Sequence, residues 1–236
     1  MGVALLAALL GGALGAVLPV PVYRLSVPYG QPPRAACEHC GAPLRWWGRR
    51  CADHLGPQWW VMGVVTAIGA GVLAASLPGP AALRIVVAVG LATLGATLGA
   101  VDVACHRLPT LIVLPSTVVG VVALIAVSAG THDWGTLGRA ALGAVAMGAA
   151  YLGLYLIPGG NLGFGDVQLA VLLGLLLGAL GWPEVVWGAL LPWLVNAPVV
   201  LVLLLLGRVG RKSRVPFGPS MLAGAVLAVA LGAVLP

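Results

Sequence analysis

The chain has 236 residues, of which 61% are hydrophobic and 8% are charged. So few charged residues could not cover the surface of a soluble domain, and the composition indicates a membrane protein. The formal net charge is +6, but the basic residues lie in a few segments between apolar runs. Such a distribution marks membrane orientation and does not indicate a nucleic-acid partner.

Apolar runs bounded by charges and prolines predict an all-α polytopic membrane protein of about eight transmembrane helices, because a helix needs about 20 apolar residues to cross the hydrocarbon core. The sixth span is the shortest: about 16 residues reach only ~24 Å at the rise of an α-helix. It therefore thins the bilayer locally or begins inside a protein-lined cavity. The expected spans are residues 2–18, 58–78, 81–101, 110–129, 137–157, 167–182, 184–206 and 216–235.

These spans divide the chain into a first transmembrane helix over 1–19, a cytosolic insert over 20–57 and a seven-helix membrane core over 58–236. Cytosolic segments of membrane proteins are enriched in Lys and Arg. If both termini lie outside, only Arg84 and Arg139 fall on the outer side, so the charges predict this orientation. The basic residues then inside are Arg24, Arg34, Arg45, Arg49, Arg50, Arg107, Arg208, Arg211, Lys212 and Arg214.

Two of the six carboxylates lie where a membrane-embedded site needs them: Asp102 closes the third span, and Asp166 opens the sixth. Ionisable residues at membrane depth are costly, and they usually face a cavity and carry function. Two close carboxylates share one proton, so the ionised partner can activate water while the protonated partner polarises a peptide carbonyl. We therefore predict an aspartyl protease pair, with Asp166 as the base, because a helix N-terminus favours its charge, and Asp102 as the acid.

Two glycines precede the second aspartate, in Gly163-Phe164-Gly165-Asp166. Glycine permits unusual backbone torsions and lets an extended substrate strand approach closely. The alternative interpretation is a simple turn in which Asp166 caps a helix.

The stretch Gly163 to Leu169 resembles the GxGD motif of the prepilin peptidases, also called type IV leader peptidases. The stretch Asp102 to Pro109 is similar to that family's first catalytic segment, and Val215-Pro216-Phe217-Gly218-Pro219 resembles a third feature, to which Pro216 and Gly218 belong. The resemblance covers most of residues 95–225. It implies a protease of the bacterial inner membrane that uses no cofactor for proteolysis. Its expected site faces the cytosol.

The family resemblance implies specific substrates: type IV prepilins or pseudopilins of pilus and type II secretion systems, which are cut after a glycine just before their hydrophobic helix. Family members with a long cytosolic insert also methylate the new N-terminus with S-adenosylmethionine. The insert here is short and shows no glycine-rich cofactor loop, so that second activity does not follow from the resemblance.

The insert contains Cys37, Cys40, Cys51 and His54 in the spacing C-x2-C-x10-C-x2-H. This spacing can supply four tetrahedral ligands to a structural zinc ion that holds the small insert together. Many prepilin peptidases resemble it with two CxxC pairs, so His54 stands where they have a cysteine. The alternative is a set of unligated thiols and a surface histidine.

Three rival functions remain at this point. A small transporter would use Asp102 and Asp166 to relay protons or bind a cation, although no internal repeat is evident. An assembly factor would keep the fold without catalysis. A presenilin-like or signal-peptide-peptidase-like enzyme would carry Pro-Ala-Leu where this chain has Pro-Phe-Gly-Pro.

Asn196 lies inside the seventh expected span, where a polar side chain predicts a hydrogen bond between helices.

Overall fold

The computed structural model describes residues 1–27, 31–45, 58–105, 110–157, 162–205 and 217–232. The described chain is all-helical apart from one isolated β-bridge, so the predicted fold class is confirmed. Its helices are α1 (Gly2–Val17), α2 (Pro19–Leu25), α3 (Gln58–Ser76), α4 (Ala81–Cys105), α5 (Thr110–Thr131), α6 (Trp134–Leu156), α7 (Phe164–Leu180), α8 (Trp182–Leu205) and α9 (Gly218–Gly232).

Each predicted span corresponds to a helix, but not every one of these helices is long enough to cross a membrane by itself. Among the described residues, Ala81–Asp102 of α4, all of α5 and all of α6 are long and apolar enough to cross a membrane. Helices α1 and α2, bent by 44° at Leu18, would add a fourth span if they count as one. The described part of α3, together with α7 and α9, is apolar but shorter. The chain is therefore an α-helical membrane protein, and the count of eight spans stays a prediction.

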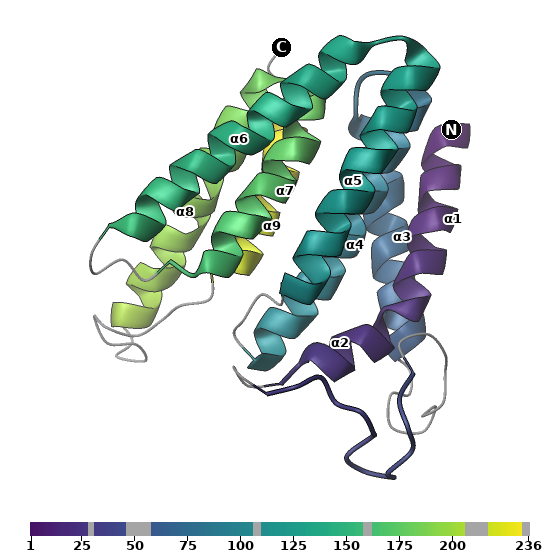
Figure 1. The fold of residues 1–236 in the computed structure, drawn as a ribbon, viewed down its shortest axis with the longest axis vertical. Coiled ribbons are helices and arrows are strands. Elements are labelled where there is room, and N and C mark those ends of the chain that lie inside the picture. Colours follow the sequence, from purple (N-terminus) through teal and green to yellow (C-terminus); the bar gives the residue numbers. More distant parts are fainter. Residues whose placement is uncertain (28–30, 46–57, 106–109, 158–161, 206–216, 233–236) are drawn as a thin grey trace.

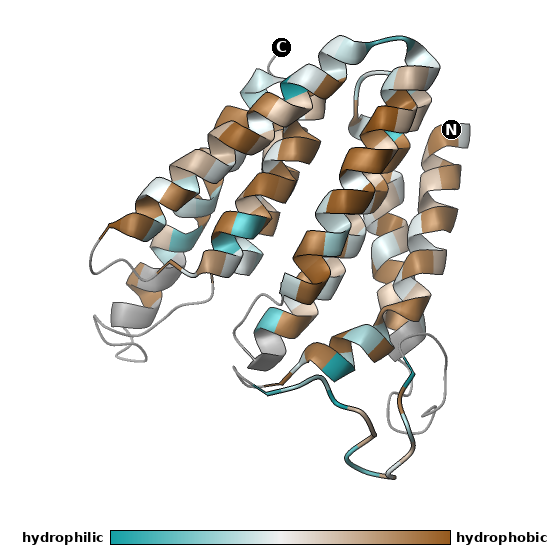
Figure 2. Ribbon diagram, viewed as in Figure 1, coloured by the Kyte–Doolittle hydropathy of each residue, from teal (hydrophilic) through white to brown (hydrophobic). Residues whose placement is uncertain are grey.

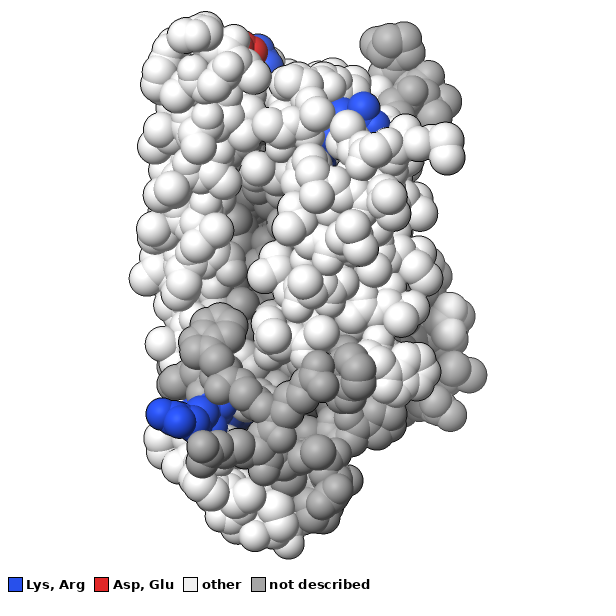
Figure 3. Space-filling view, turned by 90° about the vertical axis from the view of Figure 1, so that its right-hand side faces the viewer, with Lys and Arg blue, Asp and Glu red and all other residues white. Residues whose placement is uncertain are grey.

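The outer surface of the bundle supports the membrane assignment. Large apolar side chains are exposed along the helices, including Leu114, Val118 and Val122 on α5. Figure 2 shows that hydrophobic residues recur along the whole length of the long helices. On the face drawn in Figure 3, the Lys, Arg, Asp and Glu side chains of the described residues lie near the two ends, and the described surface between them is uncharged. Lipid tails offer such a surface no polar partner, so its apolar side chains are what a bilayer requires.

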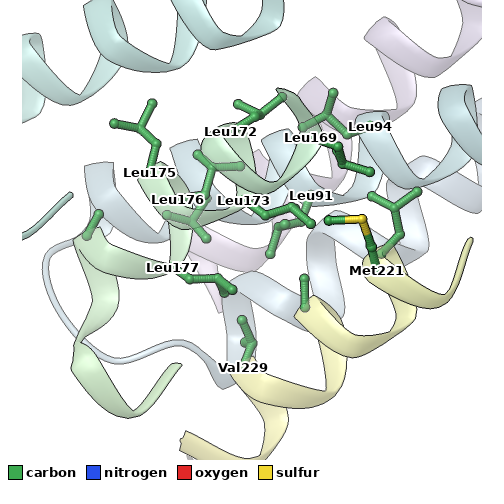
Figure 4. Close-up of a cluster of buried hydrophobic side chains, with 14 of the residues drawn as sticks. Leu91, Leu94, Leu169, Leu172, Leu173, Leu175, Leu176, Leu177, Met221 and Val229 are labelled. Carbon is green, nitrogen blue, oxygen red and sulfur yellow. The ribbon is translucent and has the colours of Figure 1, made fainter. Parts of the chain in front are cut away.

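Helix α7 lies at the centre of the bundle and packs against α4, α5, α6, α8 and α9 (Figure 1). Its leucines fill the space between α4 and α9, where Leu169 and Leu173 lie beside Leu91 and Met221 (Figure 4). Helix α2, the last turn of α4 and the first turn of α7 lie at one end of the bundle, and the start of α1 and the end of α9 lie at the other. We call the first of these the insert end.

Glycines bring α6 and α7 into backbone contact. A Cβ atom on Gly143 would lie 3.0 Å from Gly178 Cα, and one on Gly178 would lie 2.7 Å from the Arg139 carbonyl oxygen. Small residues allow this approach, which is a common way for helices to pack in lipid. The contact fixes the position of α7, whose first turn carries Asp166.

Asp133 caps α6 at the end opposite the insert end. Its carboxylate accepts hydrogen bonds from the Thr136 hydroxyl at 2.6 Å and from the Thr136 backbone N–H at 3.2 Å. The Thr136 hydroxyl is the main cause that lowers the pKa of Asp133 below its ordinary value. The stabilisation is therefore present above the ordinary pKa of an aspartate and is lost as the pH falls through the lowered pKa.

We expect Asp133→Ala to lower the thermal midpoint near neutral pH, because α6 loses its N-terminal cap. In strong acid, where the wild-type carboxyl is protonated, the two proteins should melt together. Circular dichroism of the detergent-solubilised protein measures both midpoints. A difference that persists undiminished in strong acid would contradict the role of the charged carboxylate.

Candidate active site

Asp102 and Asp166 are both buried at the insert end of the bundle. Asp102 lies in the last turn of α4, at the residue where the apolar span of that helix ends, and is 3% exposed. Asp166 is the third residue of α7 and is 9% exposed. Helix α7 begins at Phe164 and not at Val167 as expected from the sequence, so Asp166 lies inside its first turn. The two carboxylates thus come from different helices of the same core.

The register of α4 against α7 places the two carboxylates opposite each other. A Cβ atom on Gly90 of α4 would lie 3.4 Å from the Leu176 side chain of α7, and the two helices run in opposite directions (Figure 1). Asp102 is 12 residues after Gly90 and Asp166 is 10 residues before Leu176, which corresponds to about 18 and 15 Å of helix. The two residues therefore lie within about one helical turn of the same level.

Asp166 also helps to start its own helix. Its Oδ2 accepts a hydrogen bond from the Gly163 N–H at 2.9 Å, and its own N–H donates to the Gly163 carbonyl at 3.0 Å. The helix-capping interpretation of this turn is therefore correct. It leaves Asp166 Oδ1 outside the cap, so capping and a chemical role are compatible.

The expectation of unusual torsions in the glycine motif is wrong. Gly163 has φ −84° and ψ 150°, an ordinary extended conformation, and Gly165 lies within α7. Among the described residues only Gly41 and Gly79 are glycines with positive φ. An extended N-cap residue followed by a helix needs no left-handed backbone conformation. Of the two predicted roles of glycine in this motif, the close approach of a substrate strand is the one that remains.

A cluster of aromatic rings joins α6, α8 and the residue before α9, and the sequence analysis did not predict it. Tyr151 of α6 lies 6.3 Å between ring centroids from both Trp193 of α8 and Phe217, and Trp193 and Phe217 are 4.7 Å apart. The Tyr151 hydroxyl donates a hydrogen bond to the Ala189 carbonyl at 3.3 Å. These rings come from three segments that are far apart in the chain. Only Phe217 lies in a motif that the sequence analysis singled out.

Of the other residues that the sequence analysis singled out, the structure describes some and not others. Gly218 begins α9, is buried and follows Phe217 of the ring cluster, and the part of the third motif in the site stays a prediction. Pro216, His106 and Arg107 lie outside the described residues, as do Cys51 and His54.

The first half of the cysteine segment forms a tight turn. The Cys37 N–H donates to the Ala42 carbonyl and the Gly41 N–H to the Cys37 carbonyl, both at 2.9 Å, and Gly41 has φ +68°. Cys37 is buried and Cys40 is exposed. No group of three or more ligand side chains occurs within the described ranges. Both cysteines belong to this one turn, and thiolate and imidazole donors suit zinc, so the zinc site stays a prediction.

Two arginines join the insert to α2, although the sequence marked them only as orientation signals. Arg34 Nη1 donates to the carbonyls of Tyr23 at 2.8 Å and Ser26 at 2.5 Å, and its guanidinium lies 4.8 Å from the Tyr23 ring centroid. Arg24 Nη1 donates to the Leu44 carbonyl at 2.6 Å. Because α2 packs on α4, the insert is linked to the helix that carries Asp102.

Comparisons with known proteins point to one family. No model of a known protein family matches the sequence, and no solved structure matches it. Two curated proteins do, from Burkholderia pseudomallei strains 1026b and K96243, and both are named prepilin leader peptidase/N-methyltransferase. Each is 31% identical to this chain over 226 residues, a match that covers 85% of this chain and 68% of the relative.

Proposed function

The chain belongs to the prepilin peptidase family, and on this premise we propose that it is a membrane-embedded aspartic endopeptidase that removes the N-terminal leader from type IV prepilins or pseudopilins. The substrate class comes from the names of the relatives. The observation that supports the mechanism is the opposed placement of Asp102 and Asp166, two buried carboxylates on packed helices at the insert end.

In this mechanism Asp166 is ionised and Asp102 holds a proton. Asp166 takes a proton from a water molecule, whose oxygen bonds to the scissile carbonyl carbon, while Asp102 donates its proton to the carbonyl oxygen. Collapse of the intermediate breaks the C–N bond. The leaving nitrogen takes the proton from Asp166, and one hydroxyl of the intermediate returns a proton to Asp102, which restores both carboxyl groups to their starting states. The start of α7 supports this division, because the helix N-terminus and the Gly163 N–H favour a negative charge on Asp166.

We further propose an inner-membrane topology of eight spans with both termini outside and the site at the cytosolic boundary. The basic residues support this orientation, since only Arg84 and Arg139 fall outside. The fold supports it as well, because the start of α1 and the end of α9 lie at the end of the bundle opposite α2, the last turn of α4 and the first turn of α7 (Figure 1).

For the insert, we propose a structural zinc site formed by Cys37, Cys40, Cys51 and His54. When bound, zinc would close two loops of a segment too small to build a core of its own. Its role is to stabilise the insert and not to take part in proteolysis. The proposal is limited to proteolysis, because no described residue identifies a site for S-adenosylmethionine.

Cys37→Ser should remove the zinc. Protein purified without chelator should contain about one zinc per chain, and the variant should contain less than about a fifth of that, because a structural site needs all four ligands. Elemental analysis by mass spectrometry measures both values. Cys105→Ser, a cysteine outside the insert, is the matched control and should keep the metal. A wild-type protein with almost no zinc would exclude the site.

Peptide cleavage separates the protease from the transporter. Purified wild-type chain in detergent is mixed with a full-length prepilin in the presence of a chelator, and the masses of the products are determined. The proposal predicts a released leader and a shortened pilin. An intact prepilin, together with proton or cation flux in proteoliposomes that depends on the same aspartates, would favour the transporter.

A further inference from the structure

A polar pair between α8 and α9 has no place in the mechanism described so far. Ser220 Oγ donates a hydrogen bond to Asn196 Oδ1 at 3.3 Å, which confirms the predicted inter-helix hydrogen bond of Asn196. This bond uses the amide oxygen, so the two amide N–H groups of Asn196 remain for another acceptor. Both residues are half-buried. Polar side chains at membrane depth are costly and usually serve a function.

The register of α8 against α7 places Asn196 close to the level of Asp166. A Cβ atom on Gly188 of α8 would collide with the Leu177 side chain of α7, and the two helices are antiparallel neighbours joined by a short turn (Figure 1). Asp166 is 11 residues before Leu177, and Asn196 is 8 residues after Gly188. The difference of three residues corresponds to about 4.5 Å along the helix axis.

Helical periodicity directs the two side chains into the same interior space. The same Cβ atom on Gly188 would also lie 3.9 Å from the Cβ atom of Ala228 on α9. The face of α8 that carries Gly188 is therefore directed toward both α7 and α9. Asn196 is two turns further along that face, and its bond to Ser220 fixes it between α8 and α9. Asp166 is on the face of α7 that carries Leu169 and Leu173, which pack toward α4 and α9 (Figure 4).

The aromatic cluster closes this space from the α6 side. Trp193 is one turn before Asn196 on α8, and Phe217 is three residues before Ser220, and these two rings lie against each other and against Tyr151. Asn196 therefore follows this apolar ring cluster along α8 and lies, by the register of the helices, near the level of Asp166.

We propose that Asn196, oriented by Ser220, donates a hydrogen bond from its amide N–H to the substrate carbonyl that the activated water attacks. This inference rests on the proposed protease function. The donor matters most as negative charge develops on the carbonyl oxygen, so its contribution appears in the transition state and not in substrate binding. Ser220 acts as a positioning residue, because it holds the amide oxygen and so turns the N–H groups toward the site.

The test is steady-state cleavage of a prepilin by the purified full chain. Asn196→Leu, which keeps the side-chain volume, should lower kcat about 10²-fold, the effect of losing one donor to a developing oxyanion, with KM and the thermal midpoint little changed. Asn196→Ala should behave in the same way. Ser220→Ala keeps the amide and should lower kcat by less than about 10-fold, because orientation alone is lost.

Ser116→Ala is the matched control. The Ser116 hydroxyl donates to the Ile112 carbonyl of its own helix, at 2.7 Å, so its removal should leave kcat unchanged. If Asn196 only joins two helices, the Asn196 and Ser220 variants should lose stability together while folded protein keeps its kcat, and that result overturns the inference. Failure of both Asn196 variants to fold also overturns it. A wild-type chain that does not cut prepilin contradicts the protease function itself.

Discussion

Asp102→Asn and Asp166→Asn should each lower the rate of leader cleavage by roughly 10²- to 10⁴-fold, the range that general acid and base groups contribute. Asparagine keeps the size of the side chain but cannot exchange the proton that the mechanism moves. Either substitution alone should suffice, because the two carboxylates act as one unit. Initial rates with a purified prepilin, measured by the mass of the released leader, give the two values.

The control for these substitutions is Asp133→Asn, which changes a carboxylate at the opposite end of the bundle. It should leave the cleavage rate unchanged although it weakens the cap of α6. All three variants should insert and elute from gel filtration like the wild type. A cleavage rate within about tenfold of wild type for either site variant would rule out acid–base chemistry at that residue.

Gly174→Ala should both destabilise the protein and slow cleavage. The added Cβ atom would lie 2.9 Å from the Gly143 carbonyl carbon and 3.0 Å from Ala144 Cα, and it would collide with the Gly143 carbonyl oxygen. These are backbone atoms that no rotamer change can move, so α6 and α7 must separate. Overpacking of this kind costs about 1–3 kcal/mol, more than the ~0.5–1 kcal/mol that alanine gains over glycine in a helix.

The effect on cleavage follows from the position of Asp166 on the displaced helix. A displacement of about 1 Å at a catalytic group can lower a rate about 10²-fold. Gly153→Ala on α6 is the matched control, because a Cβ atom there meets nothing within 4 Å. The control should be as stable as the wild type or slightly more so, with full activity. Equal thermal midpoints and rates for the two variants would show that the α6–α7 contact is not tight.

The helices were predictable from the sequence because a long apolar run is a local property, and the expected spans match the helices to within a few residues. Helix α2 was not predicted, since Pro19–Leu25 is too short and too close to the polar insert to give an apolar signal. The start of α7 was placed too late because Gly163-Phe164-Gly165 looked like a turn, whereas Asp166 caps a helix that already begins at Phe164.

The candidate site was only partly predictable. Asp102 and Asp166 could be chosen because charged residues are rare in apolar sequence, but their opposed placement depends on the register set by contacts such as Gly90 with Leu176. No local pattern encodes that register. The partnership of Asn196 with Ser220 and the ring cluster around Tyr151 depend on tertiary packing in the same way.

The most direct test of the central claim is the mass of a prepilin recovered from cells that co-express either the wild-type chain or the double variant Asp102→Asn/Asp166→Asn. The prepilin should come from the same genome, and both chains should be present in the membrane at equal amounts. The account predicts a pilin without its leader beside the wild type and a full-length prepilin beside the variant. A leader that is retained in both cells would contradict the peptidase function, and one that is lost in both would contradict the role of the two aspartates.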